Sequence, residues 1–472
     1  ALITGITGQD GSYLSELLLK KGYKVHGLVR RVASEDKTQR LWRLKHLLDK
    51  LNLHAGSLES YASIIKLLAK IRPNEIYHLG AQSYIDYAFK DEFSTLNTNI
   101  NGTHLMRKVK SKVLSAIKSL NYSFFSVFHQ RVKGKVRPDI YKKISEKVKF
   151  NKKLNYSLFN IPHGRLYTDR VHDTAVVIND RLVDKASFQF RYKGKKIVNG
   201  SWKKNIIFSK GSPKMTKKID GKVLSLLTGG AGNNNYFHWL FDVLPRLHLL
   251  EKKNKLKLID YFLLPSQDLK FQRETLKILN LKRGKLLSSK DYRHIISKNL
   301  YLTDHPYVKQ NNPTRSIHNI PFWISKWLKK KFLKKSFKNK NFPKKIYIQR
   351  KYNKKISIRE LVNEKIIMKY LVLRGFKVIK PHSISFIKQI KFFYNAKFII
   401  GHHGAGFANI VFCKPNTKIY EMKSKYTGYL YQNLSKTNNL NYIPIIGRLV
   451  GNSGKNQEDK ISIPIKKIKE FF

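Results

Sequence analysis

The hydrophobic pattern at the start of the chain has two periods. Residues 1–4, "ALIT", are an apolar run, and apolar residues then recur at helical spacing in "SYLSELLLKKG", which ends at Gly22. "KVHGLVRR" is a second apolar run that ends at two arginines. A short buried strand, a tight turn, an amphipathic helix and a second strand produce this order. The opening residues therefore predict a strand–helix–strand unit of a parallel sheet.

The pattern changes again further along the chain. Lysine-rich sequence without a clear period follows residue 107, and alternating apolar residues with turn signals return from about 155 to 228. From about 222 onward, predicted strands alternate with amphipathic helices, which favours α/β layers. The predicted parts are a truncated nucleotide-binding segment (1–106), a basic linker (107–154), the two halves of a second α/β region (155–330 and 331–449) and a basic tail (450–472).

Glycines mark the first turn as a site for phosphate groups. Gly5, Gly8 and Gly11 follow the first strand at G-x-x-G-x-x-G spacing. Glycine lets the backbone turn sharply there and approach a pyrophosphate on the helix N-terminus. An NAD-binding unit ends its second strand with an acidic residue, whereas this chain has Arg30 and Arg31. Two cations at this point favour the 2'-phosphate of NADP.

Four stretches carry a resemblance to a known family. "GITGQDGSYL", "VHGLVRR", "RPNEIYHLGAQS" and "TNINGTHLM" resemble the GDP-mannose 4,6-dehydratases, which are extended short-chain dehydrogenases, over about residues 1–106. The resemblance implies a vestigial NADP site at Gly5, Gly8, Gln9, Asp10, Gly11, Arg30 and Arg31. It departs from the family at Ser57, where the family usually has an Asp near the adenine.

The catalytic half of that family is missing. Its members use a Tyr-x-x-x-Lys pair, in which the Tyr moves the proton and the Lys lowers the Tyr pKa. Tyr122, Tyr141 and Tyr156 are not followed by Lys four residues later. Tyr192 and Tyr347 are followed by Lys at that spacing. The first lies in a Gly-centred turn and the second ends a strand, so we attribute both matches to the Tyr-x-x-x-Lys pattern to chance. We expect a truncated Rossmann half-domain without dehydratase turnover.

Downstream, a glycine- and asparagine-rich loop leads into a helix. "GGAGNNNYFHWLFDVLPRLHLLE" places His238 and Asp242 at positions i and i+4, on one helical face. Such a pair can supply a general base. The alternative interpretation is a packed aromatic helix in which His238 is satisfied locally.

A second glycine turn lies in "KFIIGHHGAGFANIVFCKPNTKIYEM". A strand at 398–400 runs into residues 401–406, and a helix begins near Phe407 or Ala408. Small residues at such a turn expose backbone N–H groups at the positive helix end, which favours anion binding. Glu421 ends the next strand, and "KKIYIQRK" brings Arg350 to the same sheet edge. The alternative is a tight turn without function.

Together these stretches resemble glycosyltransferase family 61, the capsular-polysaccharide type, over about residues 155–449. Three ordered blocks carry the resemblance: Asn235, Tyr236, His238, Trp239, Asp242, Pro245 and Arg246; then Arg350, Arg359, Asn363 and Glu364; then Gly401, His403, Gly404, Ala405, Gly406 and Asn409, followed by Glu421. The resemblance implies a GT-B-like architecture of two Rossmann-like halves. It also implies inverting transfer from a nucleotide sugar, without a metal or another cofactor.

The resemblance also assigns roles. The donor is expected at Arg350, Gly401, His403, Gly404, Ala405, Gly406, Asn409 and Glu421. Either His238 or Asp242 is expected to be the base, and Asn235 and Arg246 are expected on the acceptor side. The expected partners are a nucleotide-sugar donor and a glycan or lipid-linked acceptor. The blocks contain no Asp-x-Asp pair that would hold a cation, so arginine and a helix N-terminus are expected to meet the diphosphate charge.

Charge and composition add few restrictions. The 472 residues carry a net charge of +64, but the lysines are scattered, which favours solvated faces over an acidic partner. The segment 327–345 interleaves aromatics with lysines, so peripheral contact with an anionic membrane is an alternative to a helix with its apolar face inward. No apolar run is long enough to span a bilayer, no secretory segment opens the chain, and the missing Met indicates a missing natural start.

Three functions are compatible with this sequence. A cytoplasmic glycosyltransferase, free or on the inner membrane face, accounts for most of the chain, and the single Cys413 fits a reducing compartment. A nucleotide-sugar dehydratase is the second candidate. A basic nucleic-acid-binding protein is the third, although no recognised RNA or DNA module occurs. The junction fits a gene fusion, a deletion remnant or an assembly artefact.

Overall fold

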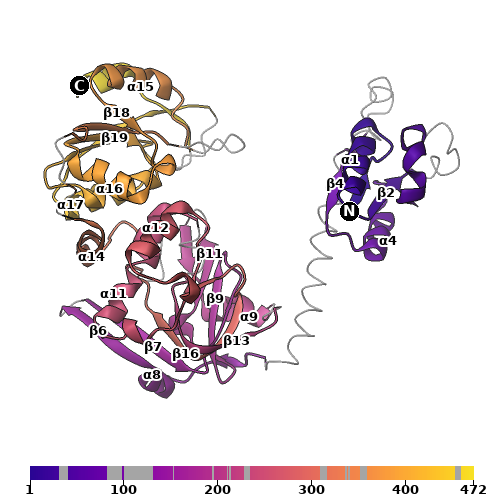
Figure 1. Cartoon of the computed structure of the whole chain (residues 1–472), viewed down its shortest axis with the longest axis horizontal. Helices are drawn as coiled ribbons and strands as arrows, with labels where there is room; N and C mark the ends of the chain where they lie inside the picture. The colour runs from indigo at the N-terminus through magenta and orange to yellow at the C-terminus, as the bar shows by residue number, and fades with distance from the viewer. Residues whose placement is uncertain are drawn as a thin grey trace. The chain divides into compact units, whose positions relative to one another are not determined.

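The computed structural model divides the chain into two compact units, Ala1–Phe124 and Phe125–Phe472 (Figure 1). It describes residues 1–30, 41–81, 98–99, 131–151, 154–193, 196–209, 211, 214–227, 234–308, 316–334, 337, 341–350, 359–451 and 459–472. No helix in this described part of the chain is long and apolar enough to cross a membrane. The fold class is α/β, as predicted.

The first unit contains a four-stranded parallel sheet in the order β3-β2-β1-β4. Its elements are β1 (Leu2–Thr4), α1 (Gln9–Lys20), β2 (Val25–Val29), the 3-10 helix η1 (Trp42–Lys50), β3 (Leu51–Ala55), α4 (Tyr61–Ile71) and β4 (Ile76–His78). Gly5 has φ +73°, and a Cβ there would lie 2.7 Å from the backbone N of Gly80. The chain can therefore pass β4 so closely only with glycine at this position. The predicted strand–turn–helix–strand unit is confirmed.

The second unit begins with a 12-stranded mixed sheet, whose main path is β12-β11-β9-β8-β16-β13-β14-β15. Its strands are β5 (Gly134–Lys135), β6 (Ser145–Asn151), β7 (Leu154–Pro162), β8 (Arg165–Thr168), β9 (Asp173–Ile178), β10 (Arg181–Leu182), β11 (Phe188–Lys193), β12 (Lys196–Asn199), β13 (Lys217–Ser225), β14 (Tyr261–Leu264), β15 (Leu286–Ser288) and β16 (His294–Thr303). The order β16-β13-β14-β15 is parallel, as in a Rossmann-like half. Strands β7–β9, β11 and β12 have antiparallel neighbours. This pairing agrees with the hairpins predicted for residues 155–228.

Helices and short helical turns connect these strands. They are α8 (Pro138–Ile144), η3 (Asp184–Ala186), η4 (Trp202–Lys204), α9 (Ile206–Ser209), α10 (Tyr236–His238), the π-helix η5 (Trp239–Val243), α11 (Arg246–Glu251), η6 (Leu256–Leu258), α12 (Lys270–Ile278), η7 (Arg283–Lys285) and α14 (Phe322–Phe332). Trp323, Trp327 and Phe332 of α14 are buried in the main core cluster. These aromatics are therefore not available to an anionic membrane, and the interpretation with the apolar face inward describes this helix.

Part of the predicted basic linker belongs to this sheet. Residues 134–151 form β5, α8 and β6, and β6 pairs antiparallel with β7. Val136, Ile144 and Val148 are buried, whereas the lysines beside Val148 point away from the core. Lysines on the exposed face mask the alternation of a half-buried strand, which is why the sequence looked like a solvated linker.

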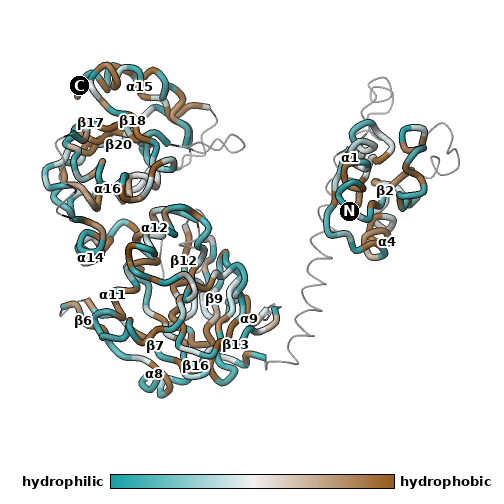
Figure 2. The backbone as a smooth tube through the Cα atoms, in the orientation of Figure 1, coloured by the Kyte–Doolittle hydropathy of each residue, from teal (hydrophilic) through white to brown (hydrophobic). Residues whose placement is uncertain are grey.

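The C-terminal part of the second unit is a five-stranded parallel sheet in the order β18-β17-β19-β20-β21. Its elements are β17 (Lys345–Ile348), α15 (Glu364–Leu373), β18 (Lys377–Ile379), η9 (Pro381–Ser383), α16 (Phe386–Asn395), β19 (Phe398–His402), the 3-10 helix η10 (Ala405–Phe412), β20 (Lys418–Lys423), α17 (Leu430–Thr437) and β21 (Asn441–Ile446). Figure 2 shows hydrophobic residues along its strands β17 and β20. One core cluster contains residues of this sheet and of the preceding one.

The predicted basic tail also packs against this sheet. β22 (Arg448–Leu449) pairs with β23 (Ile461–Ser462), and α18 (Ile465–Lys469) follows. Ile461, Ile463 and Ile468 are buried in a core cluster with Tyr347 and Ile400. The described part of the tail therefore packs into the second unit, with Lys466, Lys467 and Lys469 exposed and these three isoleucines buried.

Candidate functional site

The helical segment that starts at Tyr236 positions a histidine and an aspartate. The Oδ1 atom of Asn235 caps the segment by accepting the N–H groups of Phe237 at 2.9 Å and His238 at 3.4 Å. A π-helical turn follows, in which the N–H of Leu244 donates to Trp239 O at 3.1 Å. The predicted i, i+4 pair forms, because Nδ1 of His238 lies 2.8 Å from Oδ2 of Asp242. The Asn235 side chain is thus a helix cap through its Oδ1, and its expected contact with the acceptor stays a prediction.

Two further residues hold Asp242. Tyr307 donates its hydroxyl to Oδ1 of Asp242 at 2.6 Å, and Nε2 of His305 lies 3.5 Å from Oδ2. Nδ1 of His305 accepts the N–H groups of Tyr307 and Val308, so the His305 proton resides on Nε2, toward the carboxylate. Sequence reasoning missed His305 and Tyr307. They follow β16 without a motif. Only the pairing of β16 with β13 brings them next to His238 and Asp242, which we call the dyad.

These contacts shift the ionisation of the group. Burial alone would raise the pKa of Asp242, but the charges and hydrogen bonds of His238 and His305 hold it well below its usual value. Burial lowers the pKa of His305, so this residue is neutral. Burial also lowers the pKa of His238, but the charge and hydrogen bond of Asp242 outweigh it and the net shift is upward. Asp242 is fully buried, whereas 30% of the His238 side chain is exposed.

Arg246 is not placed for the acceptor role expected of it. Its side chain is fully buried, and its guanidinium donates to Thr303 Oγ1 at 2.9 Å, Thr303 O at 2.8 Å and Leu227 O at 2.7 Å. Burial lowers its pKa to about 10. Arg246 therefore ties α11 to the C-terminal ends of β13 and β16, which hold the loops around the dyad.

The glycine turn between β19 and η10 lies beside Arg350, as predicted. Nη1 of Arg350 donates to His403 O at 2.9 Å. Gly404 is extended (φ 175°), and a Cβ there would lie 3.5 Å from Cδ of Arg350, in ordinary contact. Gly401 is different, because a Cβ there would come within 2.9 Å of the Ile348 Cβ and carbonyl. Gly401 therefore serves packing between β17 and β19, whereas Gly404 borders the guanidinium.

Glu421 holds the ring of His403 in the glycine turn. Its Oε1 lies 2.5 Å from Nδ1 of His403, and its Oε2 accepts the Tyr442 hydroxyl at 2.5 Å. Glu421 is fully buried and cannot touch a donor in this arrangement, contrary to expectation. It fixes the ring of His403 instead. The neighbouring His402 is neutral, because burial, together with the charge of Arg350, lowers its pKa to about 3.

Two contacts connect the glycine turn with the dyad helix. Tyr236 donates its hydroxyl to Oδ1 of Asn409 at 2.6 Å, and Nδ2 of Asn409 donates to Gln389 at 2.9 Å. Tyr431 donates its hydroxyl to Gly404 O at 2.8 Å, while its ring centroid lies 5.3 Å from that of His403 and 6.3 Å from that of Phe237. Asn409 is fully buried, so it joins the two helices rather than contacting a donor.

Asn363 and Glu364 of the second block have structural contacts, whereas the donor role of Ala405 and Gly406 stays a prediction. Asn363 donates to Ile463 O at 2.7 Å, and Glu364 accepts the hydroxyl of Tyr347 at 2.7 Å. Burial raises the pKa of Glu364. Ala405 and Gly406 open η10, and a Cβ on Gly406 would lie 3.3 Å from Ile348. In the described ranges, no group of three or more His, Cys, Asp or Glu residues has the arrangement of a metal site.

The first unit contains its own pocket, of about 850 Å³, at the predicted cofactor turn. Gly5 and Arg30 line it together with Thr7, Arg43 and Ser57. Gly8 precedes α1 as its N-cap, Gln9, Asp10 and Gly11 lie in the first turn of α1, and Arg31 lies outside the described residues. Tyr141 and Tyr156 lie in the second unit, where their hydroxyls bond Asp184 and Pro306 O.

The family comparison agrees with both motif sets. Residues 236–420 match the Glycosyltransferase 61 family model. Residues 2–131 match the GDP-mannose 4,6 dehydratase model, which extends beyond the recognisable motifs that end at 106. Both resemblances are confirmed, and the glycosyltransferase 61 region contains the dyad, Arg350 and the glycine turn. This match supports a glycosyltransferase.

Curated relatives match the N-terminal part. GDP-mannose 4,6 dehydratase of Cricetulus griseus is 38% identical over 146 residues, which cover 29% of this chain and 37% of the relative. The enzyme of Vibrio cholerae serotype O1 is 42% identical over 134 residues, covering 28% and 34%. The chain thus spans about a third of the length of these relatives.

Two solved structures are similar to part of this chain. The Bordetella bronchiseptica enzyme WbmH in complex with NAD+ is 32% identical, with 24% of this chain and 34% of that chain covered and a TM-score of 0.20. UDP-glucose 4-epimerase of Thermotoga maritima with UDP-glucose is 22% identical, with 24% and 33% covered and a TM-score of 0.21.

Proposed function

We propose that the chain transfers a sugar from a nucleotide-sugar donor to a glycan acceptor, with inversion at the sugar carbon. The observation that carries this proposal is the connection between Tyr236 and Asn409, which joins the dyad helix to the glycine turn. This contact supports a single site that combines the proposed base with the proposed anion-binding turn, both within the glycosyltransferase 61 region.

The donor diphosphate is proposed to lie against Arg350 and the start of η10. The first N–H groups of a helix have no acceptor within the helix, and the helix dipole adds positive charge there. Arg350 adds a formal charge beside Gly404. These groups would stabilise the leaving nucleoside diphosphate. The three blocks contain no Asp-x-Asp pair, so we propose that they act without a metal ion.

His238 is the proposed base. Its Nδ1 is engaged by Asp242, which leaves Nε2 for the acceptor hydroxyl, and its side chain is partly exposed. Asp242 is fully buried and is the proposed positioning group, which orients the ring and stabilises its protonated form. One base and one direct displacement give inversion.

A donor screen tests this function. The full chain is incubated with UDP-, GDP-, ADP- and CMP-sugars, and release of the nucleotide is measured without and with glycan acceptors. We expect transfer from at least one donor, strongly reduced in Arg350→Ala and in His238→Ala. Turnover that persists in both variants would remove the proposed site, and no turnover of any donor would remove the function.

For the N-terminal unit we propose NADP binding without dehydratase turnover. The dehydratase match and the pocket that includes Arg30 and Arg43 support binding. Isothermal titration with NADP and NAD tests it, and the arginines predict tighter binding of NADP.

A further inference from the structure

A second cavity, of about 570 Å³, lies at the C-terminal end of β16. The residues used below are Phe188, Gln189, Asn199, Trp202, Asp304 and His305, which come from β11, β12, η4 and the segment after β16. His305 is the same residue whose Nε2 lies 3.5 Å from Asp242. The cavity and the dyad therefore share a wall.

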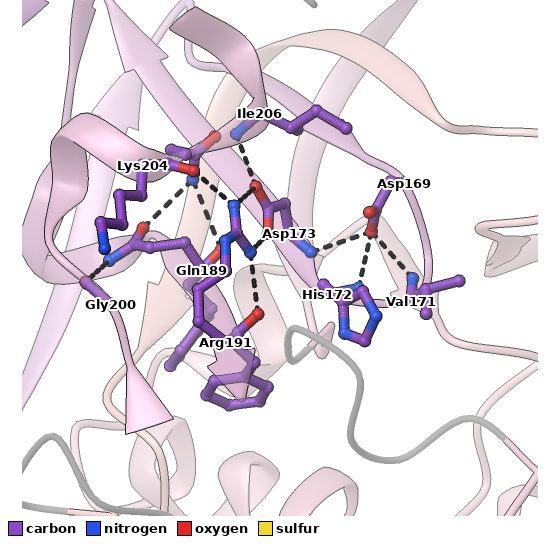
Figure 3. Close-up of polar contacts among 12 residues, drawn as sticks. Asp169, Val171, His172, Asp173, Gln189, Arg191, Gly200, Lys204 and Ile206 are labelled. Carbon is purple, nitrogen blue, oxygen red and sulfur yellow. Dashed lines mark hydrogen bonds and ion pairs between the residues drawn. The ribbon is translucent and has the colours of Figure 1, made fainter. Parts of the chain in front are cut away.

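Polar contacts fix the wall that carries Trp202. Figure 3 shows Gln189, which donates to Gly200 O at 2.7 Å, and Arg191, which bonds both carboxylate oxygens of Asp173 at 2.5 and 2.8 Å. Oδ2 of Asp173 also accepts the N–H of Ile206 at 2.5 Å. Asp173 is almost fully buried. The segment 199–206 is thereby held against β11, so the cavity is formed before any ligand arrives.

The chemistry of the lining differs from that of the rest of the chain. In a chain with a net charge of +64, the acidic residues Asp184 and Asp304 outnumber the one lysine, Lys185. Such a lining disfavours a phosphate group. Phe188 and Trp202 contribute aromatic side chains to the lining, and Asn199, whose Oδ1 accepts the N–H of Gln189 at 3.0 Å, also lines the cavity. Aromatic faces with a few polar groups suit a neutral polyhydroxyl ligand.

The position of His305 relates this ligand to the reaction. Its ring lies edge-to-face to Phe188, with centroids 6.4 Å apart, and it reaches Asp242 on its other side. We propose that this cavity binds a neutral sugar unit of the acceptor glycan, an assignment that rests on the proposed transferase function. Occupancy next to His305 would then hold the acceptor near the dyad while leaving the donor turn free.

Binding of neutral oligosaccharides tests the cavity. The full chain is titrated with cello-, malto-, manno- and chitotetraose, and with tetragalacturonate as the anionic comparison, by saturation-transfer NMR and calorimetry. We expect at least one neutral tetrasaccharide to bind, and tetragalacturonate to bind more weakly. Trp202→Ala should weaken binding about tenfold or more, because truncation of a central aromatic contact has effects of this size. Phe322→Ala, at an exposed aromatic outside the cavity, should have no effect.

Nucleotide-sugar hydrolysis without acceptor separates this assignment from the function on which it rests. We expect Trp202→Ala to hydrolyse the donor like the natural chain while its acceptor KM rises. Failure of every neutral tetrasaccharide to bind, or unchanged affinity in a folded Trp202→Ala chain, overturns the cavity assignment and leaves the transferase intact. If the natural chain turns over no donor but binds a neutral tetrasaccharide that Trp202→Ala does not bind, the cavity is a sugar site, and its acceptor role is overturned together with the transferase.

Discussion

Nδ1 of His238 lies 2.8 Å from Oδ2 of Asp242, and the two side chains differ sharply in exposure. The carboxylate is sealed in the core by Tyr307 and His305, whereas the imidazole reaches solvent. A base must meet its substrate, and a positioning group need not. The difference in exposure therefore supports our proposal that His238 is the base and Asp242 its positioning group.

Replacing Asp242 should alter the pH profile of transfer. Asp242 raises the pKa of His238, so Asp242→Asn should lower that pKa. Because the base is active when neutral, the acidic limb of the kcat/KM profile should shift to lower pH, while kcat falls. His238→Ala should lower the rate by about 10²–10⁴-fold, the usual contribution of a general base. The profile of kcat/KM from pH 5 to 9 measures this. An unshifted acidic limb in Asp242→Asn would remove Asp242 as the partner.

The two glycines at the turn should respond differently to substitution. Gly404 is extended and has room for a Cβ, so Gly404→Val should fold and lose nucleotide-sugar binding through collision with the ligand. Gly401→Ala should instead lower the free energy of unfolding, because its Cβ meets β17. Calorimetry with donors and urea unfolding distinguish the two effects. Undiminished donor affinity in Gly404→Val would make the turn merely structural.

Arg350→Ala should weaken donor binding without loss of the fold. Charge-assisted hydrogen bonds contribute about 1.5–3 kcal/mol, which corresponds to roughly ten- to a hundredfold in affinity. Calorimetric Kd values for the donor identified in the screen measure it, with Arg374→Ala, beyond α15, as the control. Equal donor affinity in the two variants would contradict the assignment.

Tyr236→Phe should destabilise the second unit. The change leaves the buried Oδ1 of Asn409 without the hydroxyl that it accepts, which costs about 1–3 kcal/mol. Urea unfolding measures the free energy, and Tyr426→Phe, at a partly exposed ring, is the matched control. The connection would be dispensable if both variants unfolded like the natural chain.

Truncation should locate the working unit. A chain that begins at Phe125 should keep transfer activity, because the second unit is intact. A chain that begins at Leu154 should be much less stable, since it lacks β6 and the buried Val136, Ile144 and Val148, each worth about 1.5–3 kcal/mol. Unfolding and transfer assays on both chains measure this. Equal stability of the two would show that β6 adds nothing to the core.

Much of the fold could be predicted because its signals are local. The turn at Gly5, the hairpins after residue 155 and the strand before Gly401 follow from short patterns of glycine and apolar residues. The segment around Val148 was missed because its lysines lie on the solvent face. His305 was missed because nothing local marks it. Conversely, Arg246, Asn409 and Glu421 stand in the motifs yet are buried, since a motif contains the supports of a site as well as its contacts.

The π-helical turn at Trp239–Val243 constrains the number of residues between His238 and Arg246. Such a turn accommodates one residue more than an α-helix does. Removing a residue within it would rotate α11 and turn Arg246 away from Thr303 and Leu227, so the ends of β13 and β16 would lose their common anchor. A conservative exchange of an apolar side chain in this segment keeps the spacing between His238 and Arg246, whereas a deletion changes it. In evolution, therefore, insertions and deletions in this block should be rarer than conservative substitutions at its apolar positions.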